Sequence, residues 1–286
     1  MIKKLYRIFD FYSGLKNSNV NRKIQSEKLI QRLRAESKSD LNKFGWKIYS
    51  QNDEDGIIHE IFKRIKIKHN FFVEIGTGTH FENNTLNLLC EGWRGVWIDG
   101  NKNYIKNYEN LLLSKIPKEC LQLLNLKIYS KNINVLRTTL NIPEEIDFLS
   151  IDIDSHEIEI LKNLDFSPRV ICVEYNAKFR GNFKFEFSEK DTSILSTDFW
   201  GNSLSSINDC LSKKGYSLVG CNITGCNSFF VKKELALNNF YLSDKLEDFY
   251  LPARYYLSSY FSSSIADVKT IIKRILSNYQ NNRFKK

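Results

Sequence analysis

Two nearly continuous apolar runs end in polar side chains, with Asp152 and Asp154 after the first run and Glu174 and Asn176 after the second. Such runs are typical of parallel strands covered on both faces, and neighbouring parallel strands end at the same edge of a sheet. Three carboxylates gathered there repel one another, so either one of them holds a proton or a cation lies among them. Because carboxylate and amide oxygens favour Mg²⁺, Mn²⁺ or Ca²⁺, we predict a divalent-metal site made of Asp152, Glu174 and Asn176.

A metal at that site would lower the pKa of a substrate hydroxyl and make its oxygen a better nucleophile. A base must still take the proton, and the predicted catalytic candidates are Asp154 and His156. A second interpretation needs no metal: Asp152 only fixes a cofactor, Asp154 caps the following helix, and His156 is an ordinary first-turn histidine.

A Gly-x-Gly turn follows an earlier apolar run, in the segment 73–78 with the sequence Val-Glu-Ile-Gly-Thr-Gly. A strand that enters such a turn and leaves it as a helix lets a cofactor approach the backbone closely. The third glycine of the dinucleotide fingerprint is replaced by Phe81, which disfavours a pyrophosphate ligand. Glu74 adds negative charge that suits a cationic ligand, and Asp99 closes the next run, where a carboxylate can accept ribose hydroxyls. We therefore predict a cofactor site at this turn.

Short strands alternate with helical stretches from residue 70 onward, which indicates a doubly wound, mostly parallel α/β sheet. Seven strands are predicted, the last two as a terminal hairpin, at Phe71–Ile75, Gly95–Ile98, within Leu121–Tyr129, and at Ile146–Ile153, Val170–Tyr175, Tyr216–Cys221 and Ser228–Val231. Helices are predicted near residues 5–12, 20–37, 53–66, 83–91, 104–113, 203–213 and 265–275.

The Glu-x-Gly-x-Gly motif, followed by an acid that closes the second strand, resembles the class I S-adenosylmethionine-dependent methyltransferases over about residues 50–232. Within that class, four segments resemble the FkbM-like and related bacterial methyltransferases of sugar and polysaccharide clusters, namely 50–56, 151–154, 174–176 and 220–227. One departure is Ser155-His156-Glu157, where such sequences often continue with Gly-Asn-Asp. The predicted metal ligands resemble the Asp/Asp/Asn site of catechol-type O-methyltransferases, with Glu174 replacing one aspartate.

The resemblance implies a Rossmann-like seven-stranded fold that binds S-adenosylmethionine, with Mg²⁺ or Mn²⁺ as an additional ion. It implies that the glycine turn faces the methionine part of the cofactor, Asp99 its ribose, and the residues after the third strand its adenine. The cofactor-binding residues so implied are Glu74, Gly76, Thr77, Gly78, Asp99, Gly100, Asn101, Ser130, Asn132 and Asp152.

Charge is unevenly distributed along the 286 residues, whose net charge is +9. Residues 1–50 carry +8 and residues 264–286 carry +5, so the central part is mildly acidic. An acidic centre argues against nucleic acid as a partner. Basic ends suit a partner surface, a second copy of the chain or an anionic membrane, although solvated terminal helices explain them equally well.

Three regions are predicted: a basic helical extension (1–49), a cofactor-binding domain (50–235) in which 177–200 forms a lid or substrate insertion, and a helical C-terminal extension with a basic tail (236–286). No apolar run is long enough to span a bilayer, and charges interrupt the first apolar segment, which argues against a secretory signal. Six cysteines without Cys-x-x-Cys spacing indicate reduced thiols and a cytoplasmic location.

The sequence thus favours an O-methyltransferase that moves a methyl group from S-adenosylmethionine to a sugar, nucleotide sugar or related polar metabolite. The resemblance alone suggests the sugar and a place in bacterial capsule or glycan biosynthesis. Two alternatives remain open: a Rossmann-type oxidoreductase with a nucleotide cofactor, and a non-catalytic adaptor or assembly factor built on a cofactor fold.

Overall fold

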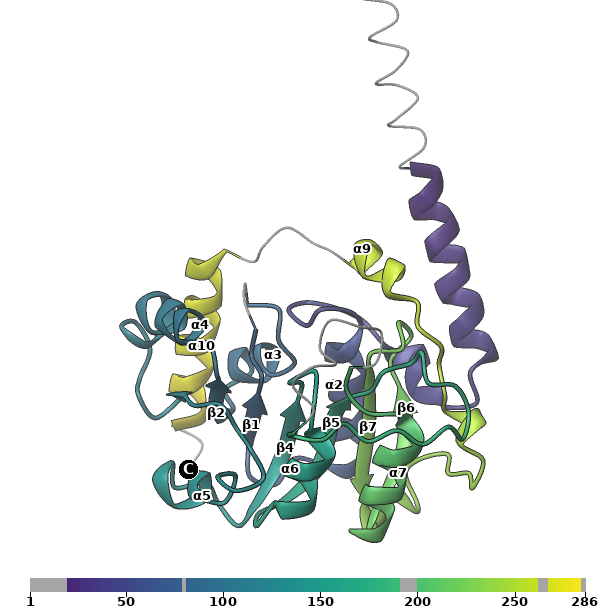
Figure 1. Cartoon of the computed structure of the whole chain (residues 1–286). Helices are drawn as coiled ribbons and strands as arrows, with labels where there is room; N and C mark the ends of the chain where they lie inside the picture. Colours follow the sequence, from purple (N-terminus) through teal and green to yellow (C-terminus); the bar gives the residue numbers. More distant parts are fainter. Residues whose placement is uncertain (1–19, 79–80, 191–199, 262–266, 284–286) are drawn as a thin grey trace, which may run out of the picture.

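The computed structural model describes residues 20–78, 81–190, 200–261 and 267–283. Its centre is a seven-stranded sheet in the order β3-β2-β1-β4-β5-β7-β6 (Figure 1). All neighbouring strands are parallel except β7, which runs antiparallel to both β5 and β6. The strands are β1 (Phe71–Ile75), β2 (Arg94–Asp99), β3 (Leu121–Asn125), β4 (Glu145–Ile151), β5 (Ser167–Glu174), β6 (Tyr216–Cys221) and β7 (Asn227–Lys232). The predicted fold class, a doubly wound and mostly parallel seven-stranded α/β sheet, is confirmed.

Helices cover both faces of the sheet, because successive residues of the central strands point to opposite sides. On β1, Val73 packs in the cluster that includes α5, α6 and α7, whereas Phe72 packs in the cluster that includes α2, α3 and α10. The α-helices are α2 (Glu54–Ile65), α3 (Leu86–Cys90), α4 (Lys102–Tyr108), α5 (Val135–Thr139), α6 (Glu157–Asn163), α7 (Leu204–Lys213), α8 (Lys233–Ala236), α9 (Ser258–Phe261) and α10 (Val268–Arg283). Shorter elements are a π-helix at Glu109–Leu113 and 3₁₀ turns at Asp40–Phe44, Leu246–Asp248 and Tyr255–Leu257.

The strand order reverses between β1 and β4, where the chain connections leave in opposite directions. Ligands of open α/β sheets bind in the crevice outside the carboxyl ends of the strands at such a switch point. The two loops are tied to each other at this point, since the Asp152 backbone N–H donates to the Ile75 carbonyl at 3.0 Å. The topology therefore brings the glycine turn after β1 next to the acidic loop after β4.

The third strand lies within the predicted range and takes only its first five residues, Leu121–Asn125, because its partner β2 ends at Asp99. Asp99 pairs with Asn125, and Leu126 makes one further bond to the Asp99 carbonyl at 3.1 Å before the chain turns away. The predicted helix at 104–113 is α4 continued by the π-helix, and residues 177–190 of the predicted insertion carry no helix or strand.

Both ends of the described chain pack against the same body. The helix of residues 20–36 projects away from the sheet (Figure 1), and its buried Ile30 contacts Ile223 and Leu257. At the other end, α10 buries Ile271 and Ile275 in the cluster that also contains α3. The predicted helix near residues 5–12 lies outside the described residues, and the three-region division stays a prediction. Among the described residues, no helix is long and apolar enough to cross a membrane.

Candidate functional site

A cavity of about 830 Å³ opens at the carboxyl ends of β1, β2 and β4. It gathers most of the predicted cofactor and catalytic residues, namely Glu74, Gly76, Thr77, Gly78, Asp99, Gly100, Asn101, Asp152, Asp154 and His156. Four other predicted residues are not among its lining residues, namely Ser130, Asn132, Glu174 and Asn176. Gln51 and Asn227 also line the cavity, although neither was among the predicted site residues.

The glycine turn has a backbone that other residues cannot adopt without strain. Gly76 has a φ of +85° and Gly78 a φ of +61°, both in the left-handed region. A Cβ atom at Gly76 would lie 1.6 Å from the Asp152 carbonyl oxygen. The Tyr108 hydroxyl donates toward the carbonyls of Thr77 and Gly78, at 3.3 and 3.2 Å. The turn is therefore held in one conformation against the acidic loop.

Glu74 holds the segment that follows the glycine turn. Its carboxylate accepts from the backbone N–H groups of Asn84 and Thr85, at 2.9 and 3.1 Å, and from the Thr85 hydroxyl. Trp97 Nε1 in turn donates to that hydroxyl oxygen at 2.7 Å. Burial, with a smaller contribution from the charge of Asp152, raises the pKa of Glu74 to about 8 even though the hydrogen bonds from Asn84 and Thr85 lower it. Glu74 thus fixes the start of α3 and also lines the cavity, and its predicted contact with the methionine part of the cofactor stays a prediction.

Asp99 connects the glycine turn to the loop after β2. Its Oδ2 accepts from the Gly78 N–H at 3.0 Å, and its Oδ1 accepts from the Asn101 N–H at 2.7 Å. Asn101 then caps α4 by accepting from the Asn103 N–H at 3.0 Å. The carboxylate is therefore oriented at the end of β2, the position from which ribose hydroxyls are reached in this fold.

Ser130 and Asn132, the predicted adenine-side residues, shape the loop after β3. Asn132 accepts from the Tyr129 N–H at 2.7 Å and donates to the Lys127 carbonyl at 2.9 Å. The Ser130 N–H donates to Glu189. The loop presents Lys127 and its neighbour Ile128 to the cavity, and the adenine contact of the two predicted residues stays a prediction.

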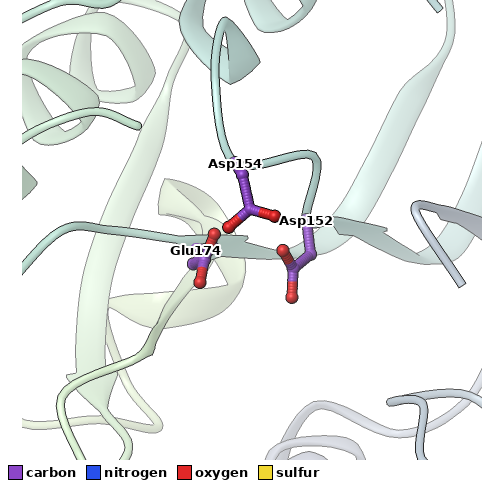
Figure 2. A group of neighbouring side chains, drawn as sticks. All are labelled: Asp152, Asp154 and Glu174. Atoms are coloured by element: carbon purple, nitrogen blue, oxygen red, sulfur yellow. The ribbon is translucent and has the colours of Figure 1, made fainter. Parts of the chain in front are cut away.

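Asp152, Asp154 and Glu174 form the acidic group, with one oxygen of each within 4.8 Å of the others (Figure 2). Asp154 has a φ of +58°, and in Figure 2 its carboxylate points toward Glu174. Burial, followed by repulsion from Asp154, raises the pKa of Asp152 to about 7. Burial and the Asp152 charge raise the pKa of Glu174 well above its ordinary value. The group therefore favours a shared proton or a bound cation.

Asn176 follows Glu174 but directs its amide elsewhere. Its Nδ2 donates to the Trp200 carbonyl at 2.9 Å, and its Oδ1 accepts from the Lys178 N–H at 3.0 Å. The side chain is fully buried and organises the loop after β5. Its role as a metal ligand stays a prediction, and in the structure both ends of its amide already have backbone partners.

His156 is buried and both of its ring nitrogens have partners. Nε2 lies 3.0 Å from the Ile128 carbonyl, and Nδ1 lies 2.9 Å from the Ser155 hydroxyl. Because a carbonyl only accepts, Nε2 carries a proton, and the Ser155 hydroxyl beside Nδ1 also lies 3.1 Å from the Ile153 carbonyl. The ring also stacks on Tyr129 with centroids 5.3 Å apart. A role as base would require breaking the contact with Ser155, whereas Asp154 is exposed; the choice between the two bases stays a prediction.

Glu54 is a functional candidate that the sequence reasoning missed. Its fully buried carboxylate accepts from the side-chain amides of Asn52, Asn222 and Asn227, at 3.2, 2.8 and 3.0 Å. These bonds join the segments 50–56 and 220–227, which the sequence had connected only through a shared resemblance. The signal was three consecutive acids at the start of a helix, which a helix cap also explains.

No family model and no curated protein matches this chain. Among solved structures, the chain is similar to the magnesium protoporphyrin IX methyltransferase of Synechocystis PCC 6803, with 10% identity, a TM-score of 0.41 and coverage of 64% of this chain and 79% of that chain. An O-methyltransferase from Bacillus cereus shows 14% identity, a TM-score of 0.39 and coverage of 72% and 88%. The glycopeptide N-methyltransferase MtfA shows 9% identity, a TM-score of 0.37 and coverage of 61% and 84%. At these scores the likenesses carry no argument about activity.

Proposed function

We propose that this chain is an S-adenosylmethionine-dependent O-methyltransferase whose acceptor is a hydroxyl group of a sugar or related polar metabolite. The observation that carries the proposal is the glycine turn at the switch point of the sheet, open to a cavity that is bordered by Glu74, Asp99 and Asp152. A cofactor with a sulfonium and an ammonium group fits such a wall, because its positive charges stabilise the ionised form of carboxyl groups whose pKa is raised by burial.

The acids also argue against the two alternatives. A nicotinamide dinucleotide would place its pyrophosphate at the glycine turn, beside Glu74 and Asp152, where negative charges repel. A non-catalytic adaptor has no need for a turn that excludes any side chain at Gly76, or for an open cavity beside it. The supported chemistry is alignment of an acceptor oxygen with the methyl carbon, which accounts for much of the rate of such a transfer.

The acidic group is the proposed acceptor side of the site. Asp152, Asp154 and Glu174 fit a divalent cation, since their oxygens converge and Glu174 Oε2 is buried without a hydrogen-bond partner among the described residues. An Mg²⁺ or Mn²⁺ ion bound there would lower the pKa of the acceptor hydroxyl. Asp154 and His156 are the proposed bases. Equal activity in a chelator and in Mn²⁺ would contradict the role of the metal but not the proposed methyl transfer.

Titration calorimetry with S-adenosylmethionine and NAD⁺ tests the proposal. We expect micromolar binding of S-adenosylmethionine and no heat with NAD⁺. Binding of NAD⁺ alone would support the oxidoreductase, and binding of neither would support the adaptor. Mass detection of a gained methyl group on nucleotide sugars would then identify the acceptor. The proposed setting is bacterial capsule or glycan biosynthesis in the cytoplasm, and six cysteines without a disulfide are consistent with that compartment.

The basic ends are proposed as a contact surface for an anionic membrane or a second copy of the chain. On the helix of residues 20–36, Val20 and Ile24 are 50% and 44% exposed, while Ile30 is buried against the body. Deleting residues 1–27 keeps this anchor and removes the exposed half of the helix. We expect the deletion to reduce binding to phosphatidylserine vesicles or to change the oligomeric state in light scattering. If neither changes, the N-terminal part of the proposed contact surface is wrong.

A further inference from the structure

We propose that Asn227 supplies the amide oxygen of the cation site, and that Glu54 is the positioning residue that turns this oxygen toward the ion. The inference rests on the proposed function, because the ion occupies the acceptor side of the same cavity. Asn227 begins β7 and pairs with Glu174, the last residue of β5. Directly opposite residues of an antiparallel pair point to the same face, with Cβ atoms about 4.5–5.5 Å apart. Asn227 also lines the cavity together with Asp152 and Asp154.

The orientation of the Asn227 amide follows from its partner. Nδ2 donates to Glu54 Oε1 at 3.0 Å, and the same carboxylate accepts from Asn222 Nδ2 at 2.8 Å and from the Asn52 backbone N–H at 2.8 Å. An ionised carboxylate only accepts, so the nitrogen of the Asn227 amide must face it. A flipped amide would place oxygen against oxygen inside a buried site. Glu54 therefore fixes Asn227 Oδ1 on the side away from itself.

The oxygen that is turned away has no protein partner. Asn227 is 5% exposed, and its Oδ1 is buried without a hydrogen bond to any described residue, as is Glu174 Oε2 on the opposite strand. Two neighbouring buried acceptors, next to the carboxylates of Asp152 and Asp154, call for a ligand that is positively charged or donates. Carboxylate and amide oxygens together are the ligands that hard divalent cations take.

The other amide near this site is already occupied. Asn176, the amide ligand predicted from the sequence, donates to the Trp200 carbonyl and accepts from the Lys178 N–H. A cation bound to Asn176 would have to share the oxygen that already accepts from Lys178. Asn227 needs no such sharing, because its oxygen is the unpartnered atom and its nitrogen is anchored.

Mn²⁺ binding to the full chain tests the inference without any acceptor or cofactor. Electron paramagnetic resonance of the free ion gives the dissociation constant. We expect Asn227→Ala to weaken Mn²⁺ binding at least 10-fold, and Glu54→Gln to weaken it about 10-fold, as for groups that orient a metal ligand. Asn52→Ala is the matched control, since it also removes a donor to Glu54 Oε1 but leaves the Asn227 oxygen in place. It should change Mn²⁺ affinity less than 3-fold, and Asn176→Ala should do the same.

A charge swap separates positioning from stability. In Glu54→Gln/Asn227→Asp, the new amide nitrogen can donate to the new carboxylate, whose second oxygen faces the cation, but it then also faces the amide nitrogens of Asn52 and Asn222. Mn²⁺ affinity should therefore recover only part of the loss of Glu54→Gln. Unchanged binding in Asn227→Ala, or a loss in Asn176→Ala instead, would overturn the inference. Calorimetry with S-adenosylmethionine on the same proteins distinguishes the two proposals. If the wild-type chain binds the cofactor but not Mn²⁺, the cation site is wrong and the proposed methyl transfer is unaffected. If the variants show the expected Mn²⁺ affinities but the chain does not bind the cofactor, the proposed methyl transfer is wrong and the cation site is supported.

Discussion

Gly76→Ala should abolish binding of S-adenosylmethionine, with a dissociation constant raised at least 100-fold in titration calorimetry. The added Cβ atom would lie 1.6 Å from the Asp152 carbonyl oxygen, a distance at which one of the two loops must move. The glycine turn and the acidic loop lie side by side and both line the same cavity, so either movement displaces groups that we expect to face the cofactor. A loss of two orders of magnitude corresponds to about 2.7 kcal/mol, which displacement of a few cofactor contacts readily exceeds.

Gly215→Ala is the matched control for that substitution. Gly215 has a φ of +84°, close to the +85° of Gly76, but no atom lies within 4 Å of a Cβ built on it. Both variants therefore lose about 1–2 kcal/mol of stability from the left-handed backbone, and only Gly76→Ala adds a collision inside the cavity. Thermal unfolding should therefore report a larger loss of stability for Gly76→Ala than for Gly215→Ala, while the cofactor affinity of Gly215→Ala stays within 3-fold of the wild type. Equal cofactor affinity in the two variants would contradict a ligand at the glycine turn.

The fold could be predicted because its signals are local. Nearly continuous apolar runs, most of them closed by glycine or an acid, indicate the parallel strands, and the helices predicted near 53–66, 104–113 and 203–213 follow from apolar spacing. The short helix α5 between β3 and β4 was not predicted. The end of β3 could not be predicted in this way, since nothing in the residues after Asn125 forbids a longer strand. That strand stops because β2 offers no partner beyond Asp99, and such a limit is set by the neighbouring strand.

The residues that line the cavity beside the glycine turn could be predicted for the same reason, since Gly76 and Gly78 come just after β1 and Asp99 ends β2. The acceptor side could be predicted only in part. Asp152 and Glu174 end neighbouring strands, but which amide accompanies them depends on the partner of β5. Because β7 runs antiparallel to β5, Asn227 lies opposite Glu174 although the two are more than fifty residues apart in the sequence. The sequence spacing therefore does not predict that contact. The role of Glu54 could not be predicted for a different reason. It is one of three consecutive acids in the sequence, and acids at the start of a helix are common without any further role.

Asp147→Ala should be among the most destabilising single substitutions at the amino ends of the strands, away from the cavity. The expected loss in the free energy of unfolding is about 3–5 kcal/mol. Asp147 is fully buried on β4 and accepts from Arg169 Nη1 at 2.6 Å and from the backbone N–H groups of His69 and Asn70 at 2.6 and 2.7 Å. The substitution leaves these donors and a buried guanidinium without their acceptor. The loop it holds also contains Lys66 and Asn70 with φ values of +62° and +52°, a conformation that needs such external support.

Glu145→Gln provides the contrast, because Glu145 lies two residues earlier on β4 with its side chain 28% exposed and pairs with Lys68 and Lys232. Such partly exposed pairs are worth about 0–1 kcal/mol, so urea unfolding should show a small loss. The double variant Asp147→Ala/Arg169→Met should recover part of the loss of Asp147→Ala, because it removes the uncompensated buried charge. A smaller loss for Asp147→Ala than for Glu145→Gln would show that Asp147 does not hold this loop. Cofactor affinity should stay unchanged in all three folded proteins. The ion pair of Asp147 and Arg169 lies near the amino ends of β4 and β5, whereas the cavity opens at the carboxyl ends of the strands, so the pair does not touch the site.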